Sequence, residues 1–100
     1  MKQTRKSPGG TSFHGHTVNA SVAQLKTVLG TPMDANNSGD DKTNFEWAME
    51  TETGDVFTVY DWKNYRPLSE TERVNWHIGS KTSTGANIAK SELMQALYKV

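Results

Sequence analysis

Residues 42–79 read KTNFEWAMETETGDVFTVYDWKNYRPLSETERVNWHIG and contain all three tryptophans of the chain. Three segments within this stretch alternate residues between two faces, as β-strands do. The residues that share a face are Phe45, Trp47 and Met49 in the first segment, Val56, Thr58, Tyr60 and Trp62 in the second, and Val74, Trp76 and Ile78 in the third. The stretch therefore predicts a three-stranded antiparallel meander at the centre of the fold.

Helix signals flank this meander. Ser21 and Gln24 have the spacing of a capping box, an apolar stripe follows, and Gly30 ends the segment. A second helix is expected over about 86–98 and a short strand over 13–18, where Gly15 interrupts a weak pattern. The order β-α-β-β-β-α predicts an α+β domain, with a mainly antiparallel sheet of three to four strands and two helices on one face.

Length and composition narrow the class of protein. A chain of 100 residues forms one domain, and 11 basic against 11 acidic residues give a net charge of zero. Zero charge argues against strong nucleic-acid binding. Cysteine is absent and no apolar run approaches the roughly 18 residues of a membrane span, so we expect a cytoplasmic protein. Residues 1–12 lack periodicity and predict a flexible basic tail before a domain of residues 13–100.

Metal and catalytic sites find little support. His14 and His16 fall on one face of a strand but lack an obvious third ligand. The segment 34–41 begins like a calcium loop but has Phe45 where the bidentate glutamate belongs, so it predicts a polar connection. Asp61 and His77 could form an acid–base dyad between neighbouring strands. We nevertheless expect no cofactor, no metal and no catalytic activity.

Two segments have the composition of a ligand site. In residues 60–66, aromatic side chains alternate with cations, a pattern that can stack a nucleobase and bind phosphate. A hydroxyl-rich turn over residues 79–85 leads into the second helix, where an anion is favoured, although plain helix capping explains it too. The candidate ligand-binding residues are Trp62, Lys63, Tyr65, Arg66, His77, Ser80, Lys81 and Thr82.

The block DKTNFEW…GDVFTVYDWKNYR…WHIG, between Asp41 and Gly79, resembles small uncharacterised proteins of tailed bacteriophages. The resemblance implies the cytoplasm of an infected bacterium as the setting. It also implies a host-takeover or anti-defence role, either as an inhibitor of a host enzyme or as a sponge for nucleotide signals.

Taken together, these patterns predict a non-catalytic binding protein that sequesters an anionic small molecule, such as a nucleotide or a cyclic nucleotide immune signal. Trp62, Tyr65 and His77 would contact the base, and the cations and hydroxyls would hold phosphate. The alternative is an inhibitor that binds a host or defence enzyme through the acidic residues Glu46, Glu50 and Glu52. A small hydrolase is the third hypothesis, and a homo-oligomer with a site between subunits is compatible with each.

Overall fold

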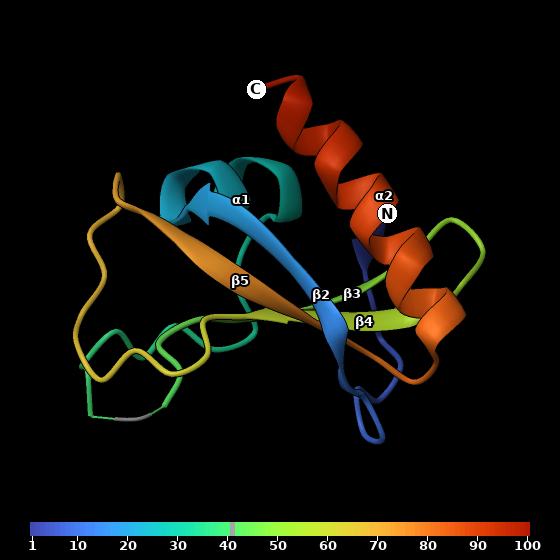
Figure 1. Ribbon diagram of the computed structural model, residues 1–100, viewed down its shortest axis with the longest axis horizontal. Coiled ribbons are helices and arrows are strands. Elements are labelled where there is room, and N and C mark those ends of the chain that lie inside the picture. The colour runs from blue at the N-terminus through green and yellow to red at the C-terminus, as the bar shows by residue number, and fades with distance from the viewer. Residues whose placement is uncertain (41) are drawn as a thin grey trace.

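The computed structural model describes residues 1–40 and 42–100 as one antiparallel sheet with two helices. In chain order the elements are β1 (Lys2–Gln3), β2 (Ser12–Ser21), α1 (Val22–Leu29), β3 (Glu46–Glu50), β4 (Val56–Tyr60), β5 (Arg73–Ser80) and α2 (Ser83–Tyr98). The strands lie in the spatial order β1-β3-β4-β5-β2, and both helices lie on the same side of the sheet (Figure 1). The predicted α+β fold is confirmed. The sheet has five strands, against the three to four predicted, because β1 was not predicted.

The core lies between the helices and the sheet and is built around two tryptophans. Trp47 on β3 and Trp76 on β5 are fully buried, and their rings meet edge to face with centroids 5.6 Å apart. Each indole N–H donates to a backbone carbonyl, Trp47 to Gly30 and Trp76 to Ala20, both at 2.8 Å. The polar atom of each ring is therefore satisfied, which allows the large apolar surface to be buried.

The capping box predicted for the first helix is present. The Ser21 hydroxyl accepts from the Gln24 amide at 3.2 Å, and the Gln24 side chain accepts from the Ser21 amide at 2.9 Å. Gly30 follows the helix with a φ of 83°, a value that favours glycine. The helix therefore begins and ends where the sequence predicts. Asp41, the last residue of the predicted polar loop, lies outside the described residues.

Residues 1–12, which the sequence predicts to be a flexible basic tail, form specific contacts with the rest of the domain. Lys2 and Gln3 pair with β3, and the side-chain amide of Gln3 donates to the backbone carbonyl of Thr31 at 2.7 Å. The Lys6 ammonium then donates to the carbonyl of Gly54 at 3.0 Å. These contacts come from backbone pairing and polar side chains, which leave no hydrophobic pattern in the sequence to reveal them.

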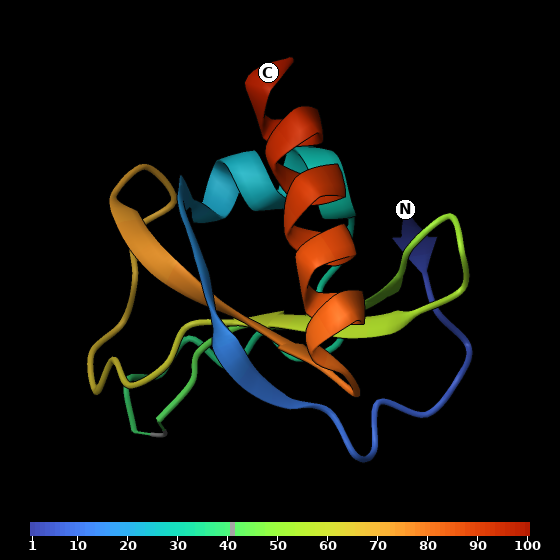
Figure 2. The same cartoon turned by 45° about the vertical axis from the view of Figure 1, so that its right-hand side comes forward.

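Residues 4–11 connect β1 and β2 across the side of the sheet that faces away from the helices (Figure 2). We call this side the open face. At the end near Gly54, Val56 is buried although it points to the open face. Elsewhere on this face a line of paired residues crosses four strands: Glu46 on β3, Tyr60 on β4, His77 on β5 and Thr17 on β2.

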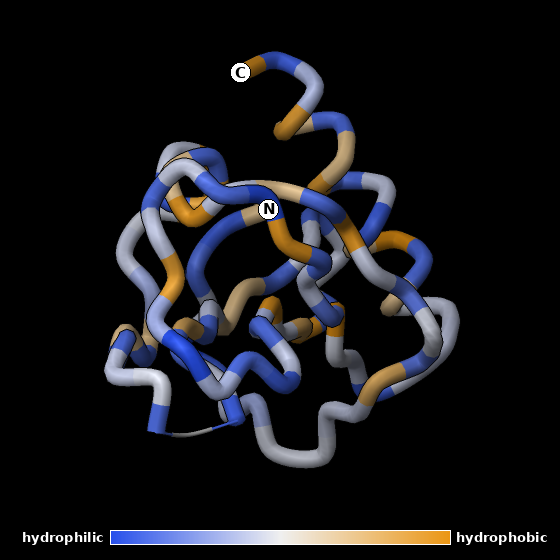
Figure 3. Tube along the Cα trace, turned by 60° about the vertical axis from the view of Figure 1, so that its left-hand side comes forward, coloured by the Kyte–Doolittle hydropathy of each residue, from blue (hydrophilic) through white to orange (hydrophobic). Residues whose placement is uncertain are grey.

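The distribution of apolar residues along the chain reflects the difference between the helix-covered face and the open face of the sheet. Along the trace they occur mostly as short separated segments in a largely polar chain, as expected where only one face of each element is buried (Figure 3). Within the described residues, neither helix has the length and apolar composition needed to cross a bilayer.

Candidate functional site

Three rings form a cluster on the open face. The imidazole of His77 stacks on the ring of Phe13, with centroids 4.0 Å apart and planes 17° apart. The ring of Tyr60 meets the His77 imidazole edge to face, with centroids 5.5 Å apart. Phe13 remains 44% exposed, so the cluster presents aromatic surface to solvent. Burial lowers the pKa of His77 below its ordinary value of 6.5, which favours the neutral form of the imidazole.

Beside this cluster lies a hollow of about 470 Å³. We call it the Trp62 hollow; it is lined by Asp34, Lys42, Thr43, Glu46, Tyr60 and Trp62. Trp62 is 44% exposed, and the Lys42 ammonium lies 5.5 Å from the centre of a Trp62 ring. An aromatic plane, a cation and carboxylates therefore border one volume.

The backbone holds the two carboxylates of this hollow together. The amide of Glu46 donates to the Asp34 carbonyl at 2.8 Å, and the amide of Asp34 donates to the Glu46 carbonyl at 3.1 Å. Burial, and next the negative charge of Asp34, raise the pKa of Glu46 above 4.5. Burial and the charge of Glu46 likewise raise the pKa of the Tyr60 phenol above 10.0.

A buried carboxylate, that of Asp61, fixes the start of the loop that carries Trp62. Asp61 is fully buried and accepts from the backbone amides of Asn44 at 2.7 Å and Phe45 at 2.8 Å. Tyr60 pairs with His77 on the open face, so its neighbour Asp61 points to the opposite face. The acid–base dyad of Asp61 and His77 that the sequence allowed is therefore not formed.

The structure brings only part of the predicted ligand site together. Trp62 and Lys63 follow β4, near the aromatic cluster that contains His77. Tyr65 is 57% exposed further along the same loop. Arg66 forms two hydrogen bonds with the Glu72 carboxylate, at 2.7 and 2.8 Å, and this ion pair lowers the pKa of Glu72 to about 2.

The hydroxyl-rich turn lies at the other end of β5. Tyr60 pairs with His77, which precedes Ser80 by three residue steps, roughly 10 Å along the strand, and this odd spacing puts Ser80 on the opposite face of the sheet from His77. Ser80 is buried, and the Thr82 hydroxyl caps α2 by accepting from the Gly85 amide at 2.9 Å. Lys81 is exposed beside them. Plain helix capping therefore accounts for this turn, and its residues do not join Trp62 and Lys63 in one pocket.

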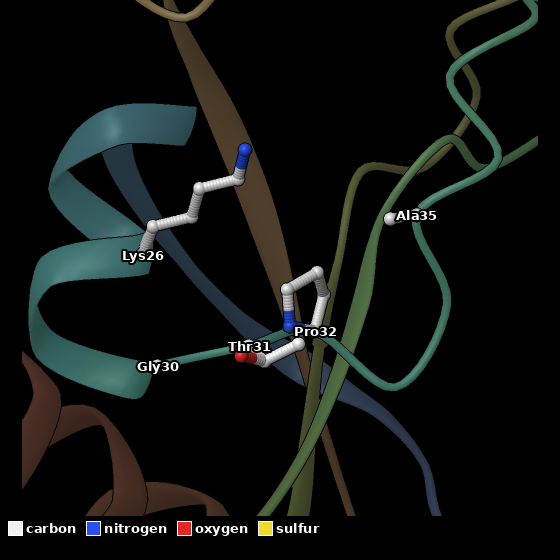
Figure 4. Close-up of a pocket in the computed structure, with 5 residues that line it drawn as sticks. All are labelled: Lys26, Gly30, Thr31, Pro32 and Ala35. Atoms are coloured by element: carbon white, nitrogen blue, oxygen red, sulfur yellow. The ribbon is translucent and has the colours of Figure 1, made fainter.

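Another hollow of about 470 Å³ lies at the end of α1, lined by Lys26, Gly30, Thr31, Pro32 and Ala35 (Figure 4). The Lys26 ammonium already pairs with Glu70 at 2.6 Å. The other lining residues offer a ring of proline, small side chains and backbone, with no aromatic plane. This hollow therefore has less recognition chemistry than the Trp62 hollow.

The sequence did not predict Phe13, Asp34 or Lys42 as site residues, and Glu46 was assigned to a protein-binding surface. Tyr60 begins the segment 60–66 that the sequence predicts to be a ligand site, but it was not among the residues assigned to the ligand. Alternation did place Tyr60 and Trp62 on one face, which was the available signal. The Phe13–His77 stack depends on how β2 pairs with β5, which the sequence does not reveal.

Comparison with protein-family models, curated proteins and solved structures finds no match for this chain. Within the described residues, no group of three or more histidine, aspartate or glutamate side chains is arranged to hold a metal ion.

Proposed function

We propose that the protein is a non-catalytic binding protein that captures an anionic, nucleobase-containing small molecule on the open face of its sheet. The observation that carries this proposal is the Trp62 hollow, where an exposed indole, a cation and hydrogen-bonding groups border one volume. An indole plane stacks on any nucleobase, and a neighbouring ammonium attracts phosphate.

The positions of the side chains around the Trp62 hollow lead us to assign a different set of residues to the ligand than the sequence predicts. Trp62 and Tyr60 supply stacking surface, and His77 with Phe13 extends it along the open face. Lys42 lines the Trp62 hollow, and Lys63 directly follows Trp62 in the chain. These two lysines therefore replace Arg66 and Lys81 as the proposed phosphate contacts. In the phage setting that the sequence resemblance implies, such a ligand would be a nucleotide signal of bacterial defence.

Native mass spectrometry of the protein, before and after mixing with a bacterial nucleotide extract, tests the proposal. We expect a retained mass of a few hundred daltons, which identifies the ligand and reports the oligomeric state in the same spectrum. Trp62→Ala should weaken binding by roughly 5- to 150-fold, the range of aromatic–base stacking. Tyr98→Ala is the control, because Tyr98 is an aromatic residue 91% exposed on α2, away from the open face. A spectrum with no retained mass argues against the proposal.

A protein-binding inhibitor is the second candidate, and the position of two carboxylates favours it. Glu46 and Glu50 point to the open face at the two ends of β3. Glu50 already pairs with Lys6 at 3.6 Å, which leaves Glu46 as the stronger contact for a basic partner. Pull-down from host lysate should then return one protein in stoichiometric amount, and Glu46→Lys should abolish the capture.

A further inference from the structure

We infer that the Trp62 hollow is specific for guanine, with Trp62 stacking on the base and the Glu46 carboxylate accepting hydrogen bonds from its donor edge. This inference rests on the proposed function and names the class of nucleotide that the same site selects. It depends on three points: the Glu46 carboxylate has no hydrogen-bond donor, guanine has the donor edge that fits two carboxylate oxygens, and Trp62 and Lys42 lie beside Glu46 in the same hollow.

The first feature is the state of Glu46. Its carboxylate is partly buried, yet it accepts no hydrogen bond from the residues that the structure describes. Its neighbours in the hollow include the carboxylate of Asp34, which repels it. An ionised carboxylate accepts but cannot donate, and leaving it partly buried without donors is unfavourable. The Glu46 carboxylate therefore has free acceptor positions that donors of a ligand can fill.

The second feature is the pattern of donors that fits two carboxylate oxygens. Guanine carries the N1–H and N2–H groups side by side, so it can donate to both oxygens at once. Adenine and cytosine each place a ring nitrogen acceptor beside their amino group, and this acceptor would face a carboxylate oxygen. Uracil places its N3–H between two carbonyl acceptors. Guanine is therefore the base whose edge matches Glu46.

The third feature is the arrangement around the stacked base. The Trp62 indole is 44% exposed, and the Lys42 ammonium lies 5.5 Å from the centre of one of its rings, so a purine that stacks on the indole would displace this ammonium toward the edge of the base. Lysine is a common partner of the O6 and N7 acceptors of guanine. A base that stacks on Trp62 thus finds acceptors for its donor edge at Glu46 and a donor for its carbonyl at Lys42.

Titration of the purified protein with GMP, IMP and AMP, followed by calorimetry, tests this inference. IMP lacks the 2-amino group and should bind about tenfold more weakly than GMP, because one charge-assisted hydrogen bond is lost. AMP should bind more weakly still. Glu46→Gln should remove the preference for GMP over AMP, since the amide replaces one acceptor oxygen by a donor.

Glu50→Gln is the matched control, because Glu50 is a carboxylate on the same face of β3 but is paired with Lys6. This variant should keep the preference for GMP. Equal affinity for the three nucleotides, or a guanine preference that survives Glu46→Gln, overturns the inference while the proposed capture of nucleotides stands. Failure of all three nucleotides to bind also overturns the inference. The proposed function is decided separately, by whether native mass spectrometry with the nucleotide extract shows a retained mass.

Discussion

Asn44 and Asp61 are joined by two hydrogen bonds in the interior, although they lie 17 positions apart in the chain. The Asn44 backbone amide donates to one oxygen of the Asp61 carboxylate at 2.7 Å, and its side-chain amide donates to the other at 3.0 Å. The same side chain donates to the carbonyls of Asn64 and Arg66. This pair therefore fixes the loop after β4, which carries Trp62.

Asp61→Ala should destabilise the protein strongly. The substitution leaves the amides of Asn44 and Phe45 buried without an acceptor, and each such group costs about 1–3 kcal/mol. We expect the free energy of unfolding, measured with urea, to fall by roughly 2–5 kcal/mol. Asp40→Ala is the control, because Asp40 is exposed, and its effect should stay within about 0.5 kcal/mol. Equal effects of the two substitutions would contradict the structural role of Asp61.

The tryptophans should differ in their contribution to stability. Trp76→Phe removes the indole N–H that satisfies the Ala20 carbonyl and leaves a small cavity in the core, so it should cost roughly 2–4 kcal/mol. Trp62→Phe should change stability by less than about 1 kcal/mol, since Trp62 is 44% exposed. Thermal and urea unfolding of both variants measure the difference, and a Trp62 variant as unstable as the Trp76 variant would refute this assignment.

His77 should make stability depend on pH in a defined direction. Because burial lowers its pKa in the folded state, the unfolded chain binds a proton more readily than the folded protein below about pH 6.5. Stability should therefore be complete above pH 6.5 and decrease as the pH falls toward the folded-state pKa. NMR titration of the imidazole measures that pKa. His77→Gln should remove this part of the pH dependence, and an unchanged stability profile would show that another group is responsible.

Glu46 should make ligand binding depend on pH as well. Burial and Asp34 raise its pKa above 4.5, and the protonated carboxyl loses one of its acceptor positions. The affinity for GMP should therefore weaken as the pH falls, beginning at a higher pH than an ordinary glutamate would give. Calorimetric titrations at a series of pH values should show this dependence in the wild type and not in Glu46→Gln.

Arg66 should be dispensable for binding. Arg66→Ala removes both hydrogen bonds to Glu72, so the pKa of Glu72 should rise from about 2 toward 4.5, as measured by NMR. The affinity for a nucleotide should stay at the wild-type value, because Arg66 is already paired with Glu72. Lys63→Ala is the comparison and should weaken binding. A large loss of affinity in Arg66→Ala would return this side chain to the site.

The elements that the sequence predicts are those in which burial alternates or a cap is local. The three central strands follow from alternation, and the Ser21–Gln24 capping box needs only neighbouring residues. β1 could not be predicted, because it consists of two exposed polar residues that only backbone pairing to β3 holds in place.

The candidate site was harder to predict, because it depends on distant contacts. Asp61 looks like a surface carboxylate in the sequence, yet backbone amides satisfy it in the interior. The Phe13–His77 stack requires the pairing of β2 with β5, which no local pattern specifies. Trp62 and His77 were predicted as ligand residues from the residue types around them in the sequence. Asp34 and Lys42, which line the hollow with Trp62, were not predicted, because they come from a distant part of the chain.

The sheet order also constrains how the chain folds during synthesis. β2 is made early but pairs with β5, and the hydrogen bond from Trp76 to Ala20 joins residues 56 positions apart. The β3–β4 hairpin can form from adjacent chain, whereas β2 has no partner strand until β5 leaves the ribosome. We therefore expect the docking of β2 to be a late step, during which the newly made chain depends on chaperones or on its own polarity to stay soluble.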